Sequence, residues 1–331
     1  MLKMNKIQWI VLGVVLLGAG CSRDVSLNKE PVLFEVRQGD TLNKVARRLA
    51  EEKIIRDAVR FKVRAKVLGY DRKLCVGTYQ ILPGENLDSL LHKMATGKVY
   101  ARMFTVPEGW NIYDIASSLV RQGILTNEEE FLEACRRVDL VTDMGVTGVS
   151  TLEGFLFPDT YSVPLNTSAE SIVKMMVKQF HKMVTPEMIE AFRSQRLSLL
   201  EAVTMASIVE KETGVEYEKP IIAGVIYNRL RLRMKLQVDP TLIYMRILEK
   251  TWDGNIRKRD FTNPSPYNTY MHYGLPPAPI ANPGKTSLLA VAFPAKTDYL
   301  YFVAKGDGSH YFSSTLQEHN QAVQRYQLKR K

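Results

Sequence analysis

Cysteine and histidine are scarce in this sequence, and their few copies are scattered. The 331 residues include three cysteines and five histidines. No spacing among them suggests a zinc site, and no metal or other cofactor is expected. One cysteine lies near the N-terminus, which leaves Cys75 and Cys135 in the body of the chain. Two cysteines do not make a disulfide framework in a domain this large. A single disulfide between Cys75 and Cys135 is permitted, but two buried thiols are the simpler interpretation.

Features typical of nucleic-acid binding are also missing. The sequence has no dense Lys/Arg patch and no aromatic RNA-binding signature, which argues against nucleic acid as a partner. It also lacks a phosphate-cradling glycine loop, which disfavours a cytosolic lyase that uses a pyridoxal cofactor. The net charge is nevertheless +10. This charge suits an anionic phospholipid surface or a polyanionic wall polymer.

The overall composition predicts a globular protein of two or three domains. Hydrophobic residues make up 45% of the chain and charged residues 24%. A chain of 331 residues can bury a sizeable core. We expect an α+β fold with the limits 1–29, 30–150 and 151–331.

The N-terminal segment, residues 1–29, has the pattern of an export signal. Lys3 and Lys6 precede an apolar stretch that begins at Ile7, and the uncharged span ends at Ser22. This span is shorter than the ~20 residues of a comfortable membrane helix. Two interpretations stay open: an uncleaved signal anchor, or a lipoprotein cleaved before Cys21, whose "LGAGC" is an imperfect lipobox. Both place the body of the chain outside the cytoplasm, tethered to the cytoplasmic membrane.

A repeat fills the first half of the chain. "FEVRQGDTLNKVARRLAEEKII" (34–55) aligns with "FTVPEGWNIYDIASSLVRQGIL" (104–125), and residues 79–97 form a third, partial copy. Each copy alternates like a strand, turns at a glycine and continues with helical spacing. The "VxxGDTL" of the first copy resembles a LysM module, which binds the N-acetyl sugars of peptidoglycan or chitin. Region 30–150 is therefore expected to bind the cell wall or to serve only as a packed scaffold.

One helix of the second half, predicted over residues 197–214, carries an unusual carboxylate. On a wheel of ~100° per residue, Glu210 falls in the apolar arc near Val203, whereas Glu201 and Glu212 fall on the charged side. An unpaired carboxyl among apolar neighbours should have a raised pKa, as a general acid requires. The alternative is that Glu210 caps a neighbouring loop or pairs with an arginine.

Polar residues gather downstream in segments rich in proline. Residues 263–284 hold six of the fifteen prolines, and long ordered loops tend to carry function. Amides, hydroxyls and aromatic rings suit an N-acetyl sugar. For each single residue, turn chemistry or packing is the alternative. The polar set comprises Gln237, Asp239, Tyr267, Asn268, Thr269, Tyr270 and Asn282.

These segments together resemble a known enzyme family. "ASIVEKET", "VIYNRL", "LQVDPTLIY", "YNTY", "GLPPAPIANPG" and the C-terminal "AFPAKTDYLYFVAKGDGSHYF" are similar to the MltG/YceG-like endolytic murein transglycosylases, over roughly residues 34–325. The resemblance implies a membrane-anchored enzyme with a LysM-like subdomain and a mixed α/β catalytic domain with a long Pro-rich cleft loop. It also implies that Glu210, the first glutamate of "VEKET", is the essential acid.

The resemblance further implies a set of substrate-binding residues. Glu153 in "LEGFLFPDTY" and Tyr244 in "LQVDPTLIY" lie in segments that match cleft-lining motifs, and Val238 and Met245 depart from the family pattern. The expected substrate-binding residues are Gln237, Asp239, Tyr244, Asn268, Tyr270 and Glu153.

The implied reaction is cleavage of nascent peptidoglycan strands between N-acetylmuramic acid and N-acetylglucosamine. Glu210 would protonate the glycosidic oxygen and then deprotonate the muramyl C6 hydroxyl, which closes a 1,6-anhydro ring. The implied partners are peptidoglycan glycan strands, the cytoplasmic membrane and peptidoglycan synthases. A lysozyme-type hydrolase of the same bond and a non-catalytic wall-binding scaffold are the alternatives. Asp239 could be a second catalytic acid, although Pro240 favours an orienting role.

Overall fold

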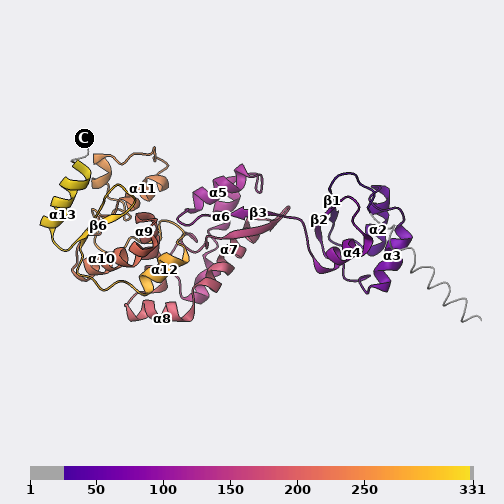
Figure 1. Ribbon diagram of the computed structural model, residues 1–331, viewed down its shortest axis with the longest axis horizontal. Coiled ribbons are helices and arrows are strands. Elements are labelled where there is room, and N and C mark those ends of the chain that lie inside the picture. The colour runs from indigo at the N-terminus through magenta and orange to yellow at the C-terminus, as the bar shows by residue number, and fades with distance from the viewer. Residues whose placement is uncertain (1–25, 329–331) are drawn as a thin grey trace, which may run out of the picture. The chain divides into compact units, whose positions relative to one another are not determined.

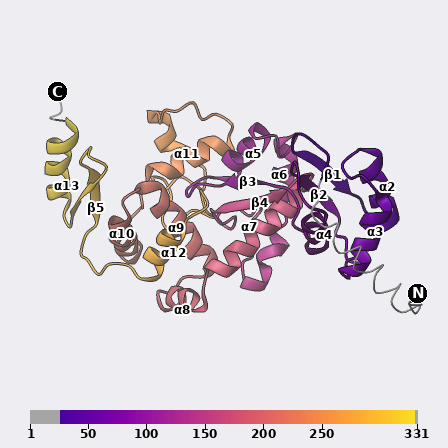
Figure 2. The ribbon, with the colours of Figure 1, turned by 45° about the vertical axis from the view of Figure 1, so that its right-hand side comes forward.

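The computed structural model describes residues 26–328, which divide into two compact units (Figures 1 and 2). Unit 1 comprises residues 26–103 and 162–166, and unit 2 comprises residues 104–161 and 167–328. This division falls near residue 103, whereas the sequence predicted a limit at 150. The predicted membrane anchor at 1–29 lies almost entirely outside the described residues. Within residues 26–328, no helix is both long and apolar enough to cross a membrane.

Unit 1 is a small α+β unit with its own core. Strands β1 (Val32–Val36) and β2 (Gly77–Ile81) pair antiparallel, with Val32 opposite Ile81. Helices α2 (Leu42–Glu51) and α3 (Ala58–Val67) connect them, and α4 (Leu87–Thr96) follows β2. Aromatic and aliphatic side chains of all five elements form the core, among them Phe34, Val45, Phe61, Tyr79 and Leu90.

The three copies of the repeat are three strand–turn–helix units, as predicted. They are β1–α2, β2–α4, and β3 (Ala101–Thr105) with α5 (Ile112–Arg121). Gly39, Gly84 and Gly109 each turn the chain with a positive φ of 71–79°, which a glycine adopts without strain. Two residues later, Thr41, Asn86 or Asn111 caps the helix with its side chain. The shared spacing therefore encodes both the turn and the helix start.

Unit 2 is mostly helical, which differs from the predicted mixed α/β domain. The ribbon within unit 2 is β5 (Tyr301–Ala304) paired with β6 (His310–Ser313). Strand β3 also pairs with β4 (Thr160–Pro164), and both of these strands include residues of each unit. Five helices lie in its central part: α7 (Ala169–Met183), α8 (Pro186–Ser194), α9 (Leu199–Glu212), α10 (Lys219–Arg231) and α12 (Lys285–Ala292). The remaining elements are α6 (Glu128–Ala134), η1 (Val138–Met144), η2 (Glu216–Glu218), α11 (Asp239–Leu248), η3 (Lys258–Thr262), α13 (Leu316–Val323) and η4 (Gln324–Leu328).

Helix α9 is the centre of unit 2. Helices α8, α10, α11 and α12 pack around it, and α10 and α12 lie beside it in both views (Figures 1 and 2). The eight residues from Ala202 to Val209 are all buried. Since this stretch has no solvent-facing side, a helical wheel cannot sort its side chains into core and surface. The long segment 263–284 forms only turns and bends, as expected.

Candidate active site

Glu210, the predicted catalytic acid, is held in a buried ion pair. Its Oε1 accepts a hydrogen bond from Lys219 Nζ at 3.0 Å, and the side chains of Glu210 and Lys219 are only 7% and 3% exposed. Glu210 Oε2 accepts from the Gly284 backbone N–H at 2.9 Å and from the Ser287 hydroxyl at 2.7 Å. The expectation of an unpaired carboxyl among apolar neighbours is therefore wrong, because the start of α10 and the start of α12 both supply donors.

A second carboxyl, Glu108, shares the Lys219 ammonium. Glu108 Oε2 lies 3.8 Å from Lys219 Nζ, and about half of the Glu108 side chain is exposed. Burial raises the pKa of Glu108, and the neighbouring charge of Glu210 adds to the effect. Lys219 also donates to Thr286 Oγ1 at 2.8 Å. These contacts tie the end of α9 to the loop that precedes α5 and to the first turn of α12.

Glu212, the last residue of α9, has a raised pKa. Burial raises the pKa of Glu212 to about 8, and the negative charge of Asp239 contributes to the rise, while Arg229 opposes it. Taken as a whole residue, Glu212 is partly exposed, in the same range as Glu210. The wheel placed Glu212 on the charged, outward side of the helix. That side is in fact covered, because α10 and the segment leading into α11 meet the end of α9.

Asp239 and Tyr270, both predicted from sequence to bind substrate, lie together beside Glu212. Tyr270 Oη donates to Asp239 Oδ1 at 2.6 Å. The charge of Asp239 acts on Glu212, and burial, the hydrogen bond to Asp239 and the charge of Glu212 raise the pKa of Tyr270. Both side chains keep solvent access. They come from the first residue of α11 and from the Pro-rich segment, two elements far apart in sequence.

Arg229 lies beside Glu212, and Gln237 lies two residues before Asp239. Gln237 is exposed, has a φ of +53°, and its N–H donates to Thr269 O at 3.2 Å. Arg229 is anchored by its guanidinium to the carbonyls of Lys235, Leu236 and Leu300. Burial lowers the pKa of this arginine. Its fixed charge lies beside Glu212 and offsets part of the effect of Asp239.

Glu153 and Tyr244 lie together but are buried, apart from any open surface. Glu153 is 2% exposed and accepts from the Ile112 N–H, from Tyr244 Oη at 3.0 Å and from Asn282 Nδ2 at 3.0 Å. Burial raises the pKa of Glu153 to about 8. A carboxyl this enclosed positions its neighbours. It does not reach a bound glycan in this arrangement.

Asn282 links three segments of unit 2 through one side chain. Its Oδ1 accepts from the N–H groups of Gly154 and Leu156, and its Nδ2 donates to Trp110 O and Glu153 Oε1. Asn282 is fully buried. The three loops around residues 110, 154 and 282 are therefore fixed relative to one another.

Asn268 was predicted to bind substrate, and the structure places it inside the Pro-rich segment. It is 0% exposed, and its Nδ2 donates to the carbonyls of Asp260, Phe261 and Asn263. Its Oδ1 accepts from the Tyr270 N–H at 2.9 Å. Turn chemistry, the alternative interpretation from sequence, describes Asn268 better than sugar binding does.

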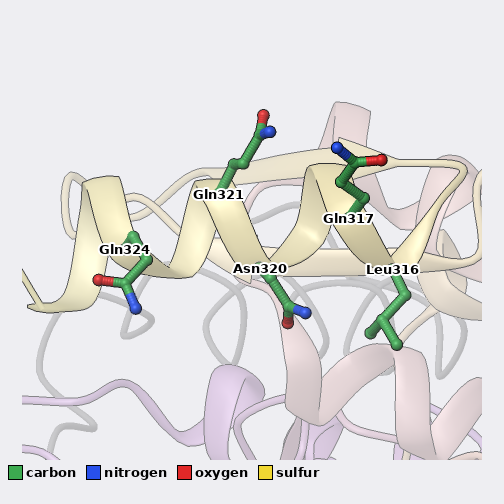
Figure 3. A pocket seen from close by; sticks show the side chains of 5 residues that line it. All are labelled: Leu316, Gln317, Asn320, Gln321 and Gln324. Carbon is green, nitrogen blue, oxygen red and sulfur yellow. The ribbon is translucent and has the colours of Figure 1, made fainter.

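One surface hollow lies away from these groups. It is lined by Leu316, Gln317, Asn320, Gln321 and Gln324, whose side chains project from α13 and the turn after it (Figure 3). None of these side chains is titratable, and none of the predicted site residues lines the hollow. It therefore offers no acid–base chemistry.

Three side chains around these carboxyls were not predicted from the sequence. Lys219 starts α10 in a charged stretch and reads as an exposed lysine, Arg229 reads as one of several surface arginines, and Glu108 sits at a turn. Their roles depend on which helix ends meet in space, and no local pattern encodes that. For Glu212 the sequence held one indication of a place in the site, because this residue lies in the same "VEKET" segment as Glu210.

The match to known proteins identifies the class. A family model for the YceG-like family matches residues 34–325, and the chain belongs to this family. The endolytic murein transglycosylase of Bacillus subtilis (strain 168) is 34% identical over 338 residues, which cover 96% of this chain and 91% of the relative.

Two further proteins support the membership. The endolytic murein transglycosylase of Streptococcus pneumoniae serotype 2 is 27% identical over 323 residues, which cover 89% of this chain and 58% of that protein. The crystal structure of a YceG-like protein from Listeria monocytogenes, 32% identical, matches with a TM-score of 0.59 over 89% of this chain and 99% of that one.

Proposed function

We propose that this chain is an endolytic peptidoglycan lytic transglycosylase that uses Glu212 as its general acid and base. Family membership and the named activity of the relatives support the reaction class. The observation that carries the residue assignment is the position of Glu212 beside the Asp239–Tyr270 pair, where burial and the charge of Asp239 raise its pKa to about 8. A carboxyl with this pKa keeps its proton at neutral pH, as proton donation to a substrate requires.

The proposed reaction needs one carboxyl. Protonated Glu212 donates its proton to the oxygen between N-acetylmuramic acid and N-acetylglucosamine, and the bond from this oxygen to the muramyl C1 breaks through an oxocarbenium-like state. The resulting carboxylate accepts the proton of the muramyl C6 hydroxyl, whose oxygen bonds to C1. The products are a 1,6-anhydromuramyl end and a free 4-hydroxyl. Because the nucleophile belongs to the substrate, no water has to be captured.

Asp239, Tyr270 and Gln237 are proposed to bind the sugars around this carboxyl. Asp239 is exposed and linked to Tyr270, so the pair presents an acceptor and an aromatic ring. The charge of Asp239 also favours the protonated form of Glu212. A hydrolase would instead use Asp239 to guide water or to attack the sugar. The nearness of Glu212 and Asp239 raises this alternative. The reaction products distinguish a hydrolase from a transglycosylase.

Glu210 is proposed to position the end of α9. Its carboxylate bonds Lys219, Gly284 and Ser287 and leaves no oxygen directed only at solvent. The ion pair of Lys219 and Glu210 therefore holds the end of α9, where Glu212 lies, against the start of α10 and the start of α12. In this role Glu210 is essential to the site's geometry without touching the substrate.

The cellular setting belongs to the same proposal. The apolar start of the sequence is proposed to anchor the chain in the cytoplasmic membrane, with both units on the outer side. The LysM-like unit 1 is proposed to bind glycan. Cleavage of nascent strands next to peptidoglycan synthases would terminate their elongation.

Product analysis tests the reaction directly. Purified full-length chain in detergent is incubated with uncross-linked glycan strands, and the products are separated and weighed by mass spectrometry. We expect internal cleavage with 1,6-anhydromuramyl ends. Products heavier by one water per cleavage would instead identify a hydrolase, and intact strands that bind the protein would identify a non-catalytic scaffold.

A further inference from the structure

Helix α3 of unit 1 carries an exposed apolar ridge. Val59, Val63 and Val67 are 60%, 48% and 69% exposed, and their spacing of four residues places them on one face. The opposite side of the helix is anchored, because Phe61 and Ala65 are fully buried. The ridge is therefore a fixed surface of a packed helix. Within unit 1, α3 lies on the side away from β1 and β2 (Figures 1 and 2).

Basic residues flank this ridge on both sides. Four of the ten residues of α3 are Lys or Arg, and none is acidic. At ~100° per residue, Lys62 and Lys66 border the valines on one edge and Arg60 borders them on the other. Apolar side chains bordered by basic ones form the pattern of a helix that lies in a membrane interface.

The tether to the N-terminal segment is short. Unit 1 begins at Ser26, whose N–H donates to Glu85 O and whose hydroxyl donates to Leu82 O. Only three residues separate Ser26 from the end of the uncharged run at Ser22, and four separate it from Cys21. At about 3.5 Å per residue, either form of anchor keeps Ser26 within about 18 Å of the membrane. Electrostatic attraction falls off over about 10 Å, so unit 1 comes within its range when the tether is not fully extended.

We propose that the Val59–Val63–Val67 ridge docks unit 1 onto the anionic phospholipid surface of the membrane that anchors the chain. Lys62 and Lys66 contact phosphate groups while the valines enter the headgroup layer. The inference uses the anchoring proposed above and goes beyond the reaction. It assigns α3 a partner that no glycan-binding role requires, since valines offer no hydrogen bonds to a sugar.

A tryptophan reporter in the full-length chain tests the docking. Val63→Trp is reconstituted into vesicles of phosphatidylcholine, alone or mixed with phosphatidylglycerol, with bromine-labelled acyl chains as quenchers. After subtraction of the emission of the unmodified chain, which has three tryptophans, we expect blue-shifted, quenched emission from the reporter in the mixed vesicles only. Leu33→Trp is the matched control, because Leu33 is exposed on β1. Its emission should be the same in both vesicle types.

Charge variants separate docking from anchoring. Lys62→Gln combined with Lys66→Gln should weaken docking roughly five-fold per charge removed, whereas Lys44→Gln with Lys98→Gln should not. Two results would overturn the docking alone. One is a chain that floats with anionic vesicles while the Val63→Trp reporter stays unquenched, and the other is equal quenching in neutral vesicles. Chain that does not float would overturn anchoring and docking together. Cleavage of soluble glycan by the same samples reports on the proposed reaction independently.

Discussion

At the scale of single residues, two glutamates two positions apart have opposite environments. Glu210 accepts hydrogen bonds from an ammonium, an N–H and a hydroxyl, whereas Glu212 lies in a desolvated position beside the negative charge of Asp239. The difference arises because Lys219 starts α10 next to one carboxyl and not next to the other. A carboxyl held by fixed donors serves structure, and one that retains its proton serves proton transfer.

The raised pKa of Glu212 predicts the pH dependence of the reaction. The acid must be protonated at the start, so kcat/KM should fall as pH rises through about 8. A pH–rate profile on soluble glycan measures this limb. A profile flat from pH 6 to about 9 would contradict the assignment of the acid.

The same shift predicts how stability depends on pH. The pKa of Glu212 is raised on folding, so the folded state binds more protons than the unfolded state between the two pKa values. The free energy of unfolding should therefore decrease as pH rises from about 4.5 towards about 8. Glu212→Gln should flatten this decrease in urea melts recorded across the range. Glu153→Gln should act in the same direction, because its pKa is also about 8.

Removal of the Glu210 charge should cost stability. Glu210→Gln leaves the Lys219 ammonium buried with a weaker partner, and the loss of one member of such a pair costs about 3 kcal/mol. Urea denaturation measures the change. Glu190→Gln is the control, since the exposed pair of Glu190 with Arg193 should contribute less than about 1 kcal/mol. An equal, small effect of both changes would refute a structural role for Glu210.

At the scale of elements, the site depends on loops held by buried side chains. Asn282 satisfies two N–H groups and one carbonyl and also bonds the Glu153 carboxyl. Gly154 lies under this contact with a φ of +88°, and a Cβ there would lie 2.5 Å from Pro279. The loop therefore requires glycine at this position both for its conformation and for its packing.

Asn282→Ala should destabilise unit 2 by about 2–3 kcal/mol, because it leaves buried N–H groups without acceptors. Thermal melts of the full chain give the change in midpoint. Asn255→Ala is a matched control on an exposed turn and should leave the midpoint within error. Equal midpoints for the two variants would show that the Asn282 contacts are dispensable.

Local elements could be predicted from sequence, but the position of the acid could not. The glycine and the cap two residues later predict each strand–turn–helix copy, and Ser168 caps α7 as expected. The wheel placed Glu210 inside and Glu201 outside, as the structure does, but it placed Glu212 outside, where burial in fact raises its pKa. Asp239 and Tyr270 were predicted from their chemistry, whereas Lys219 and Arg229 act through tertiary neighbours. Asn268 was misassigned because an amide that closes a turn resembles one that binds a sugar.

At the scale of the whole molecule, two separate cores predict two separable unfolding events. The core of unit 1 uses only residues of β1, β2, α2, α3, α4 and their connections. Phe61→Ala should open a cavity there at a cost of about 3–5 kcal/mol. Calorimetry should show one transition moved to lower temperature and the other unchanged. A common shift of a single transition would mean that the two units unfold together.

The assignment of the acid is tested most directly by the products of paired variants on purified glycan strands. Mass spectrometry should find anhydromuramyl ends from the unmodified chain and a rate about 10²–10⁴ lower for Glu212→Gln. Glu210→Gln, assayed below its unfolding midpoint, should retain measurable cleavage. Full cleavage by Glu212→Gln together with a folded but inactive Glu210→Gln would contradict the account.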